Sequence, residues 1–233
     1  MKNFSNRYIF IFSAVMVVVV ATLLSLAATL LQPAQERNLE IEKKKNMLES
    51  INVPSTRANT KELYDRYIKE SFVINSKGET VNGIDAFTVA LRKEQKKPFE
   101  EQFLPVFWAT PDDGEKVIII PVEGKGLWGP IYGYISLKSD LNTIYGVNFD
   151  HKGETPGLGA EINTTPFEGQ FHNKQLFDNG SFVSIQVIKG GAPENDIHGV
   201  DAISGGTITS NGLQKMIFDC IQKYDYYLLK KRN

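Results

Sequence analysis

The sequence predicts an α+β fold, in which an antiparallel sheet is packed with helices and preceded by one N-terminal transmembrane helix. Three observations support this prediction: an uncharged apolar run near the N-terminus, a series of short apolar strands in the middle, and an amphipathic helix at the end. Strands that follow one another directly, with a long helix after them, are typical of an antiparallel sheet covered by helices.

The uncharged run extends from Tyr8 to Leu31. As a helix it is roughly 36 Å long, which is enough to cross a bilayer with some tilt. A cleaved signal peptide is the alternative, because Lys2 and Arg7 make the N-terminus positive. The run is longer than the apolar part of a signal peptide, however, and no convincing small-residue cleavage site precedes Pro33. We therefore expect an uncleaved anchor.

The charges that flank this run bear on its orientation. Lys2 and Arg7 favour a cytoplasmic N-terminus, whereas Arg37 and the run 43–45 lie on the other side. We expect the bulk of the chain to lie outside the cytoplasm. The run holds no acidic, basic or histidine side chain, so it is expected to serve as an anchor and to carry no ion path by itself.

Composition and charge exclude several classes of function. The chain of 233 residues has 26 basic and 27 acidic side chains, which is no footprint for nucleic acid. The single cysteine, Cys220, excludes an internal disulfide and a thiolate metal cluster. His151, His172 and His198 lack the spacing of metal ligands, so no metal is expected.

We divide the chain into an anchor (1–33), a juxtamembrane helix with a linker (34–59) and a domain outside the cytoplasm (60–233).

The first half of the soluble part reads as helices with one strand. Apolar residues punctuate a charged stretch over 35–52, which indicates a helix, and 54–59 is a linker. Apolar side chains at helical spacing predict a helix over 61–70. A strand over 71–74, a turn at 76–78 and a helix over 84–97 that ends before Pro98 complete this half.

The second half reads as strands and one long helix. A Pro-Asp-Asp-Gly turn joins the strands 104–109 and 116–122 into a hairpin. Two more strands are expected over 131–137 and 141–149, and an alternating strand over 181–188. A final helix over 211–229 has apolar residues at intervals of three and four. They are Leu213, Met216, Ile217, Cys220, Ile221, Tyr224 and Leu228.

Three glycine-rich stretches contain the residues with functional chemistry: 124–133, 151–161 and 201–210. The third joins hydroxyl side chains and two glycines directly before the final helix, where free N–H groups and the helix dipole favour a phosphate. Taken alone, it fits an ordinary helix cap better. Three such loops in one small domain suggest a large planar ligand that the backbone approaches from several sides.

These stretches resemble a known family. Asp201-Ala202-Ile203-Ser204-Gly205-Gly206-Thr207 is similar to the flavinylation motif of FMN-binding domains, and Glu154-Thr155-Pro156-Gly157-Leu158-Gly159 matches their second signature. The segment 126–133 is similar to the C subunits of the Na⁺-translocating NADH:quinone reductase. The resemblance covers the anchor and essentially the whole soluble domain. Gly206 departs from the motif, which usually has alanine there; we expect modification to occur all the same.

The resemblance implies FMN bound covalently to Thr207 through a phosphoester. A separate Mg²⁺-dependent flavin transferase would install it from FAD, which makes Thr207 an acceptor and leaves no catalytic residue on this chain. Asp201 would position the hydroxyl or form a turn, and both roles stay open. Trp128 would shield the flavin or lie buried in the sheet, which the sequence favours. The other expected FMN-binding residues are Ser204, Gly205, Gly206, Thr209, Thr155, Gly157, Leu158, Gly159, Leu127 and Lys189. For Lys189, a solvated position at the end of a strand fits at least as well.

The implied function is an electron relay in a membrane respiratory complex of the bacterial inner membrane, with partner subunits of the A, B, D, E and F type. No NADH-binding Gly-x-Gly-x-x-Gly follows a strand, so NADH oxidation, quinone reduction and the ion path would belong to those partners. Two alternatives stay open: the G subunit of the related Rnf ferredoxin:NAD⁺ complex, and a membrane-anchored binding or assembly module without flavin.

Overall fold

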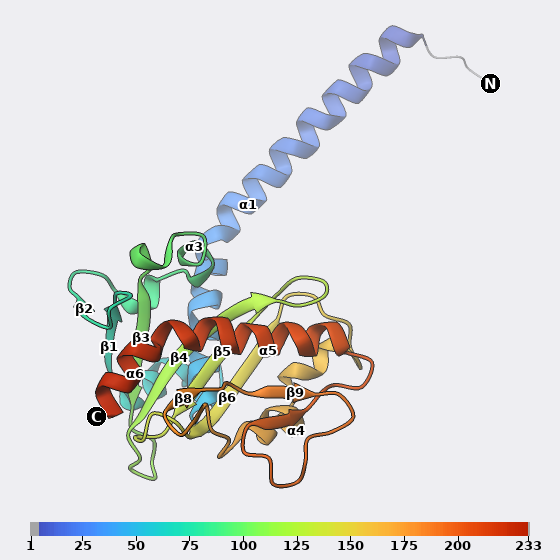
Figure 1. Ribbon diagram of the computed structural model, residues 1–233. Coiled ribbons are helices and arrows are strands. Elements are labelled where there is room, and N and C mark those ends of the chain that lie inside the picture. The colour runs from blue at the N-terminus through green and yellow to red at the C-terminus, as the bar shows by residue number, and fades with distance from the viewer. Residues whose placement is uncertain (1–4, 233) are drawn as a thin grey trace. The chain divides into compact units, whose positions relative to one another are not determined.

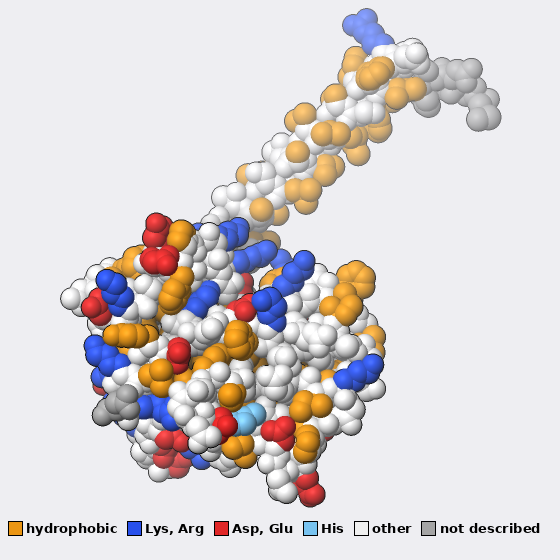
Figure 2. Space-filling model, viewed as in Figure 1, with side chains coloured by type: hydrophobic (Ala, Val, Ile, Leu, Met, Phe, Trp, Pro, Cys, Tyr) orange, Lys and Arg blue, Asp and Glu red, His pale blue; other side chains and the backbone are white. Residues whose placement is uncertain are grey.

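A computed structural model describes residues 5–232 of the chain (Figure 1), which divides into two compact units, Met1–Lys43 and Lys44–Asn233. The first unit is the greater part of helix α1 (Asn6–Ser50). Among the described residues, α1 is the one helix that is long and apolar enough to cross a membrane. Hydrophobic side chains lie exposed along it (Figure 2). The helix continues through Pro33, so the expected anchor and juxtamembrane helix form one continuous helix.

The second unit is built on a six-stranded sheet with the order β2-β1-β3-β4-β5-β6, in which neighbouring strands are antiparallel. This confirms the predicted α+β class. The strands are β1 (Ile68–Ile74), β2 (Thr80–Val81), β3 (Leu104–Ala109), β4 (Val117–Lys125), β5 (Pro130–Leu137) and β6 (Ile144–His151).

Both faces of this sheet are covered. Helix α5 (Thr207–Ile221), red in Figure 1, packs on one face with Leu213 and Ile217, against Ile118 and Ile120 of β4. On the other face, Ile119 belongs to a second apolar cluster. Because side chains alternate along a strand, a central strand buried on both faces is apolar at every position.

The second cluster contains the last turn of α1. Met47, Leu48, Ile51 and Val53 are buried among side chains of β3, β4 and the segment 84–89. Residues 44–59, which the sequence suggested as a helix and linker leading to the domain, therefore supply part of its core.

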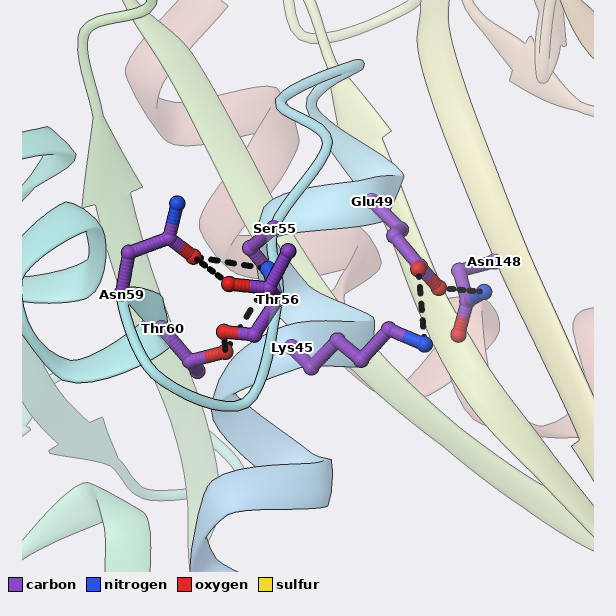
Figure 3. A network of polar contacts seen from close by, with 7 residues as sticks. All are labelled: Lys45, Glu49, Ser55, Thr56, Asn59, Thr60 and Asn148. Carbon is purple, nitrogen blue, oxygen red and sulfur yellow. Dashed lines mark hydrogen bonds and ion pairs between the residues drawn. The ribbon is translucent and has the colours of Figure 1, made fainter.

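Polar contacts fix this stretch further, as Figure 3 shows. Glu49 forms an ion pair with Lys45 (3.3 Å) and accepts a hydrogen bond from the side-chain amide of Asn148 on β6 (3.1 Å). In the following turn, Asn59 Oδ1 accepts from the N–H (2.7 Å) and the hydroxyl (2.9 Å) of Thr56. The end of α1 is thus tied to the edge strand of the sheet.

The remaining elements are short: some lie before or between the strands of the sheet, some connect β6 to α5, and the last two follow α5. They are α2 (Thr60–Tyr67), η1 (Ala86–Thr88), α3 (Leu91–Glu94), η2 (Phe99–Glu101), η3 (Gly159–Asn163), α4 (Thr165–Glu168), η4 (Gly169–Phe171), β7 (Phe177–Asp178), β8 (Ser181–Phe182), β9 (Gln186–Ile188), β10 (Gly199–Asp201), η5 (Gln222–Tyr224) and α6 (Asp225–Arg232).

Four expectations about these elements need correction. The helix over 84–97 is wrong, because Val89 and Ala90 are extended and separate η1 from α3. The strand over 181–188 is wrong, because Ser184 has φ +64° and divides it into β8 and β9. The helix expected over 61–70 ends at Tyr67, where β1 follows. The last helix begins four residues earlier than predicted, at Thr207, and η5 separates α5 from α6.

Candidate functional site

The site is organised around the start of α5. Gly206 is the N-cap residue (φ −101°, ψ 31°), and no side chain caps the helix. Thr207 is the first helical residue, and its side chain is exposed. The first N–H groups of a helix have no partner within the helix, and they lie at the positive end of its dipole. An exposed hydroxyl therefore lies beside backbone donors suited to a phosphate.

The turn before α5 is in contact with the second glycine-rich stretch. Gly205 has φ +74°, a conformation that favours glycine. A Cβ atom at Gly205 would lie 2.5 Å from Leu158 Cδ2, so Leu158 occupies the space that a side chain would need. The absence of a side chain thus permits the loop after β6 to pack on the stretch that holds Thr207.

A single buried carboxylate connects all three glycine-rich stretches. Glu154, in the loop after β6, is 5% exposed. Its Oε2 accepts a hydrogen bond from the hydroxyl of Thr209 in the first turn of α5 (2.5 Å). Its Oε1 accepts the N–H of Trp128, in the turn between β4 and β5 (2.9 Å). Hydrogen bonds to a charged acceptor are stronger than those between neutral groups, so Glu154 holds the loops in one arrangement.

Two glycines give this carboxylate its space. A Cβ at Gly126 would lie 2.5 Å from Glu154 Oε1, and a Cβ at Gly159 would lie 2.5 Å from Glu154 Oε2 and 2.5 Å from Thr209 Oγ1. Neither position can take a side chain without displacing Glu154. Gly126 and Gly159 therefore make room for the carboxylate, in addition to any ligand.

Exposed apolar side chains belong to the same loops. Leu127 (44% exposed), Trp128 (69%), Leu158 (42%) and Ile208 (58%) present hydrophobic surface. The sequence favoured a buried sheet tryptophan at position 128, and this is wrong: Trp128 lies in the turn that joins β4 to β5. Large apolar groups that the fold leaves uncovered next to a polar site are typical of a ligand-binding surface.

Asp201 has a structural partner that the sequence did not suggest. It ends β10, which pairs in parallel with β9, and its Oδ1 accepts the N–H of Ala192 (2.7 Å). The carboxylate thus fixes the loop with Gly190 and Gly191, both of which have positive φ. Lys189 is exposed at the start of this loop. Its backbone is therefore held near the Thr207 stretch.

The remaining predicted residues differ in accessibility. Thr155 is exposed, and its carbonyl accepts the N–H of Leu158 (3.1 Å). Gly157 has φ +74° and donates its N–H to Glu161 (2.9 Å). Ser204 is exposed before Gly205. Thr209 is buried, and its hydroxyl is directed to Glu154.

Glu154, which joins the three loops of the site, is not among the site residues expected from the sequence. Its only sequence signal is its place at the head of the second signature. A carboxylate in a glycine-rich loop ordinarily reads as a solvated residue. Its partner Thr209 lies in another stretch of the chain, which the sequence gives no means of pairing with it.

A second, half-buried carboxylate lies next to the end of β6. Glu168, at the end of α4, accepts the N–H of Phe149 on β6 (2.6 Å). Burial raises its pKa to about 7, and the nearby Glu49 and Asp150 act in the same direction, while the hydrogen bond from Phe149 acts against them. This hydrogen bond joins α4 to the end of β6, close to the start of the loop that contains Glu154.

The histidines have backbone partners. His172 Nδ1 lies 2.7 Å from the carbonyl of Tyr145, His198 Nδ1 lies 2.7 Å from that of Gln175, and His151 Nδ1 accepts the N–H of Glu154 (3.2 Å). Within residues 5–232, no group of three or more histidine, cysteine or acidic side chains could hold a metal ion.

Comparison with known proteins identifies the family. The sequence profile of the FMN-binding domain matches residues 126–222. This range includes the three glycine-rich stretches, apart from residues 124 and 125 at the start of the first one. The C subunit of the Na(+)-translocating NADH-quinone reductase of Vibrio vulnificus strain YJ016 is 34% identical over 212 residues, covering 84% of this chain and 83% of the relative. The chain belongs to the family of these C subunits. The C subunit of Haemophilus ducreyi is 30% identical over 202 residues, covering 80% of this chain and 78% of the relative.

Solved structures of C subunits share the fold. The one from Parabacteroides distasonis is 43% identical with a TM-score of 0.78, covering 85% of this chain and 96% of that one. The one from Shewanella oneidensis is 29% identical with a TM-score of 0.69, covering 84% of this chain and 99% of that one. Similarity of this extent covers the domain as well as the FMN-binding segment. The relatives are named as subunits of an enzyme complex, so this chain is one part of a multi-subunit membrane assembly.

Proposed function

We propose that this chain carries FMN covalently on Thr207 and relays electrons between other redox centres of a Na⁺-translocating NADH:quinone reductase. The observation that supports the proposal best is the exposed hydroxyl of Thr207 on the first residue of α5. It combines an accessible acceptor atom with the free N–H groups of a helix start. Family membership supplies the kind of ligand, since the matching profile is that of the FMN-binding domain.

The residues of the site suit both the phosphate and the flavin ring of FMN. The N–H groups that follow Gly206 would hold the phosphate, and the helix dipole favours its negative charge by about 0.3–1 kcal/mol. Leu127, Trp128 and Leu158 would contact the flavin ring, which is planar and apolar on its faces. Hydrogen bonds from Trp128 and Thr209 to Glu154 fix the positions of the loops that carry these side chains. When bound, FMN supplies the electron-accepting and electron-donating chemistry, while the protein sets its position and surroundings.

Attachment would be a group transfer carried out by a separate Mg²⁺-dependent flavin transferase. The hydroxyl oxygen of Thr207 forms a bond to the FMN phosphorus of FAD, the bond between the two phosphates breaks, and AMP leaves while the hydroxyl proton is lost. Thr207 is the acceptor in this step, and no residue of this chain acts as a catalyst.

The rest of the reaction would belong to partner subunits. Helix α1 has no ionisable side chain between Tyr8 and Leu31, so it offers no ion path by itself. We place the chain in a bacterial inner membrane as a single-pass protein with its soluble domain on the extracytoplasmic side, as the charges of Lys2 and Arg7 favour.

Intact mass measurement tests the proposal. The chain purified from a host that contains the transferase should be heavier by one FMN residue. Its band on a denaturing gel should fluoresce under ultraviolet light. Thr207→Ala and Thr207→Leu should lose both signals, while the exposed control Thr80→Ala keeps them. A label that persists in the Thr207 variants would refute the acceptor assignment. A wild-type chain that carries no flavin in such a host would refute the function.

A further inference from the structure

A groove runs along the outer side of α5, apart from the Thr207 turn. Its volume is about 980 Å³, and it lies between α5, the turn joining β4 to β5, and the segment with α3 and η2. In Figure 2, Lys and Arg side chains gather on the viewed face in the region between the α3 and α5 labels of Figure 1. The residues that the argument uses are Arg92, Phe99, Lys125, Lys215, Met216 and Lys223.

The floor of the groove is apolar and closely packed. Met216 is buried beneath it, and a Cβ at Gly124 would lie 2.7 Å from Met216 Cβ. Phe99, which is 38% exposed, stands at its side. Because α5 packs directly on the backbone of β4 here, the floor is a fixed part of the fold and offers a preformed apolar surface.

The walls carry an excess of positive charge. Arg92, Lys125, Lys215 and Lys223 line the groove together with two acidic residues, Glu123 and Asp219. Asp219 pairs with Lys215 (2.8 Å), which cancels one charge of each sign. The chain as a whole has a net charge of −1, so this groove is a local concentration of basic side chains. Its charge complements an acidic occupant.

The residues that line the groove are close along the chain to those of the proposed flavin site. On α5, the residues Ile208, Gly212, Lys215 and Asp219 follow one another at helical spacing, and Ile208 comes directly after Thr207. On the other wall, Lys125 and Gly129 line the groove, and Trp128 lies in the same turn. A segment bound in the groove would therefore lie close to Ile208 on α5 and to Trp128 in the turn between β4 and β5.

We propose that this groove docks an acidic, amphipathic segment of a partner subunit of the membrane complex. The proposal rests on the proposed function, because it places a partner beside the residue that would carry FMN. A polypeptide segment uses all the features at once: apolar side chains fit the floor over Met216, and carboxylates pair with the basic walls. Contact with the turn that carries Trp128 brings the partner within reach of the flavin.

Site-specific photo-crosslinking in the intact complex tests the position of the partner. A photoreactive residue at Gln222, which lines the groove, should crosslink to one segment of one partner subunit, and that segment should contain several Asp or Glu residues. The same residue at the exposed Lys61 on α2 serves as the control. Crosslinks from Gln222 only to lipid, to solvent or to basic segments would overturn the proposal.

Charge reversal tests the chemistry. In the full chain within its complex, the double variant Lys125→Glu with Lys223→Glu should lower recovery of the partner subunits at least tenfold. The matched double variant Lys61→Glu with Lys77→Glu should leave it unchanged. Lysine substitutions in the crosslinked acidic segment should restore recovery with the groove variant. Unchanged recovery in the groove variant would overturn the proposal.

The intact mass of the same samples separates this proposal from the flavin assignment. A groove variant that keeps the FMN mass while losing its partners supports docking. A variant that loses the FMN mass and keeps its partners would overturn docking of a subunit and assign the groove to the flavin transferase. A wild-type chain without FMN, together with loss of partners in the groove variant, would refute the flavin proposal and leave the docking surface in place.

Discussion

Thr209 Oγ1 donates a hydrogen bond to Glu154 Oε2 at 2.5 Å, and both residues are buried. The bond joins the first turn of α5 to the loop that follows β6, and the two partners are 55 positions apart in the sequence. The other oxygen of Glu154 accepts the N–H of Trp128. The relative positions of Thr207, Leu158 and Trp128 therefore depend on one carboxylate that never reaches the surface.

Replacing Glu154 should loosen the site. Glu154→Ala leaves the Thr209 hydroxyl and the Trp128 N–H without their buried acceptor, which costs about 1–3 kcal/mol for each unpaired group. Glu154→Gln retains one carbonyl oxygen and should lose less. Urea unfolding of the detergent-solubilised protein measures the change in stability, and intact mass measures the FMN content, which should fall in the same order. The exposed Glu194→Ala is the control, and equal stability of Glu194→Ala and Glu154→Ala would contradict the role of Glu154.

Restoring alanine at position 206 should destabilise this chain, although alanine is usual in the flavinylation motif. The φ of Gly206 (−101°) suits alanine, but its Cβ would lie 2.9 Å from Ile203 Cγ2. Overpacking of this kind costs about 1–3 kcal/mol. Ile203→Ala removes the obstructing atom, so the two substitutions together should cost less than the sum of their separate effects. A double-mutant cycle measures this coupling, and additive effects would show that Ile203 is not the obstacle.

Stability should depend on pH through Glu168. Its pKa is raised to about 7 by burial, so the folded state binds the proton more tightly than the unfolded state, where the pKa is 4.5. The resulting stabilisation is complete below pH 4.5 and is lost as the pH rises through about 7. We expect Glu168→Gln to remove this loss, which makes the variant more stable than the wild type by about 1–2 kcal/mol at pH 8 once solvent screening is allowed for.

The measurement is urea unfolding at pH 5 and at pH 8, read as the difference between variant and wild type. The exposed Glu101→Gln should show the same pH dependence as the wild type. A Glu168→Gln variant that parallels the wild type across this range would contradict the assignment.

The domain should fold when the chain begins at residue 44 and fail when it begins at residue 60. The longer chain keeps the buried side chains of Met47, Leu48, Ile51 and Val53. Their burial contributes about 1.5–3 kcal/mol each, which in sum approaches the whole stability of a typical domain, about 5–15 kcal/mol. Circular dichroism and thermal unfolding of the two chains check this. A cooperative transition in the shorter chain would show that residues 44–59 are dispensable.

Local signals predicted the sheet well. The strand 104–109 coincides with β3, and the strand 131–137 lies within β5, because a tight turn or a glycine-rich loop bounds each of them in the sequence. The amphipathic spacing of the last helix likewise appears in the burial of Leu213 and Ile217. These features depend on residues that are close together in the chain, so a single sequence is enough to predict them.

Features that depend on distant partners could not be predicted. Phe87 and Val89 pack against the second apolar cluster, and the chain there is a short 3-10 helix followed by extended residues, in place of the helix expected over 84–97. Trp128 looked like a core residue because nothing in the sequence separates a buried tryptophan from one exposed in a turn. The partners of Glu154 and Asp201 likewise come together only in the folded chain.

The exposure of Thr207 bears on the order of events during biogenesis. Its neighbours Gly206 and Thr209 are buried, so the turn adopts its shape only when the domain core is complete, yet the Thr207 hydroxyl still lies on the surface. A modifying enzyme can therefore act on the finished domain without unfolding it. In an immature chain the same hydroxyl would lack its helix start and its apolar surroundings. Under the proposed attachment to Thr207, folding would therefore reserve cofactor loading for chains whose three loops have already assembled.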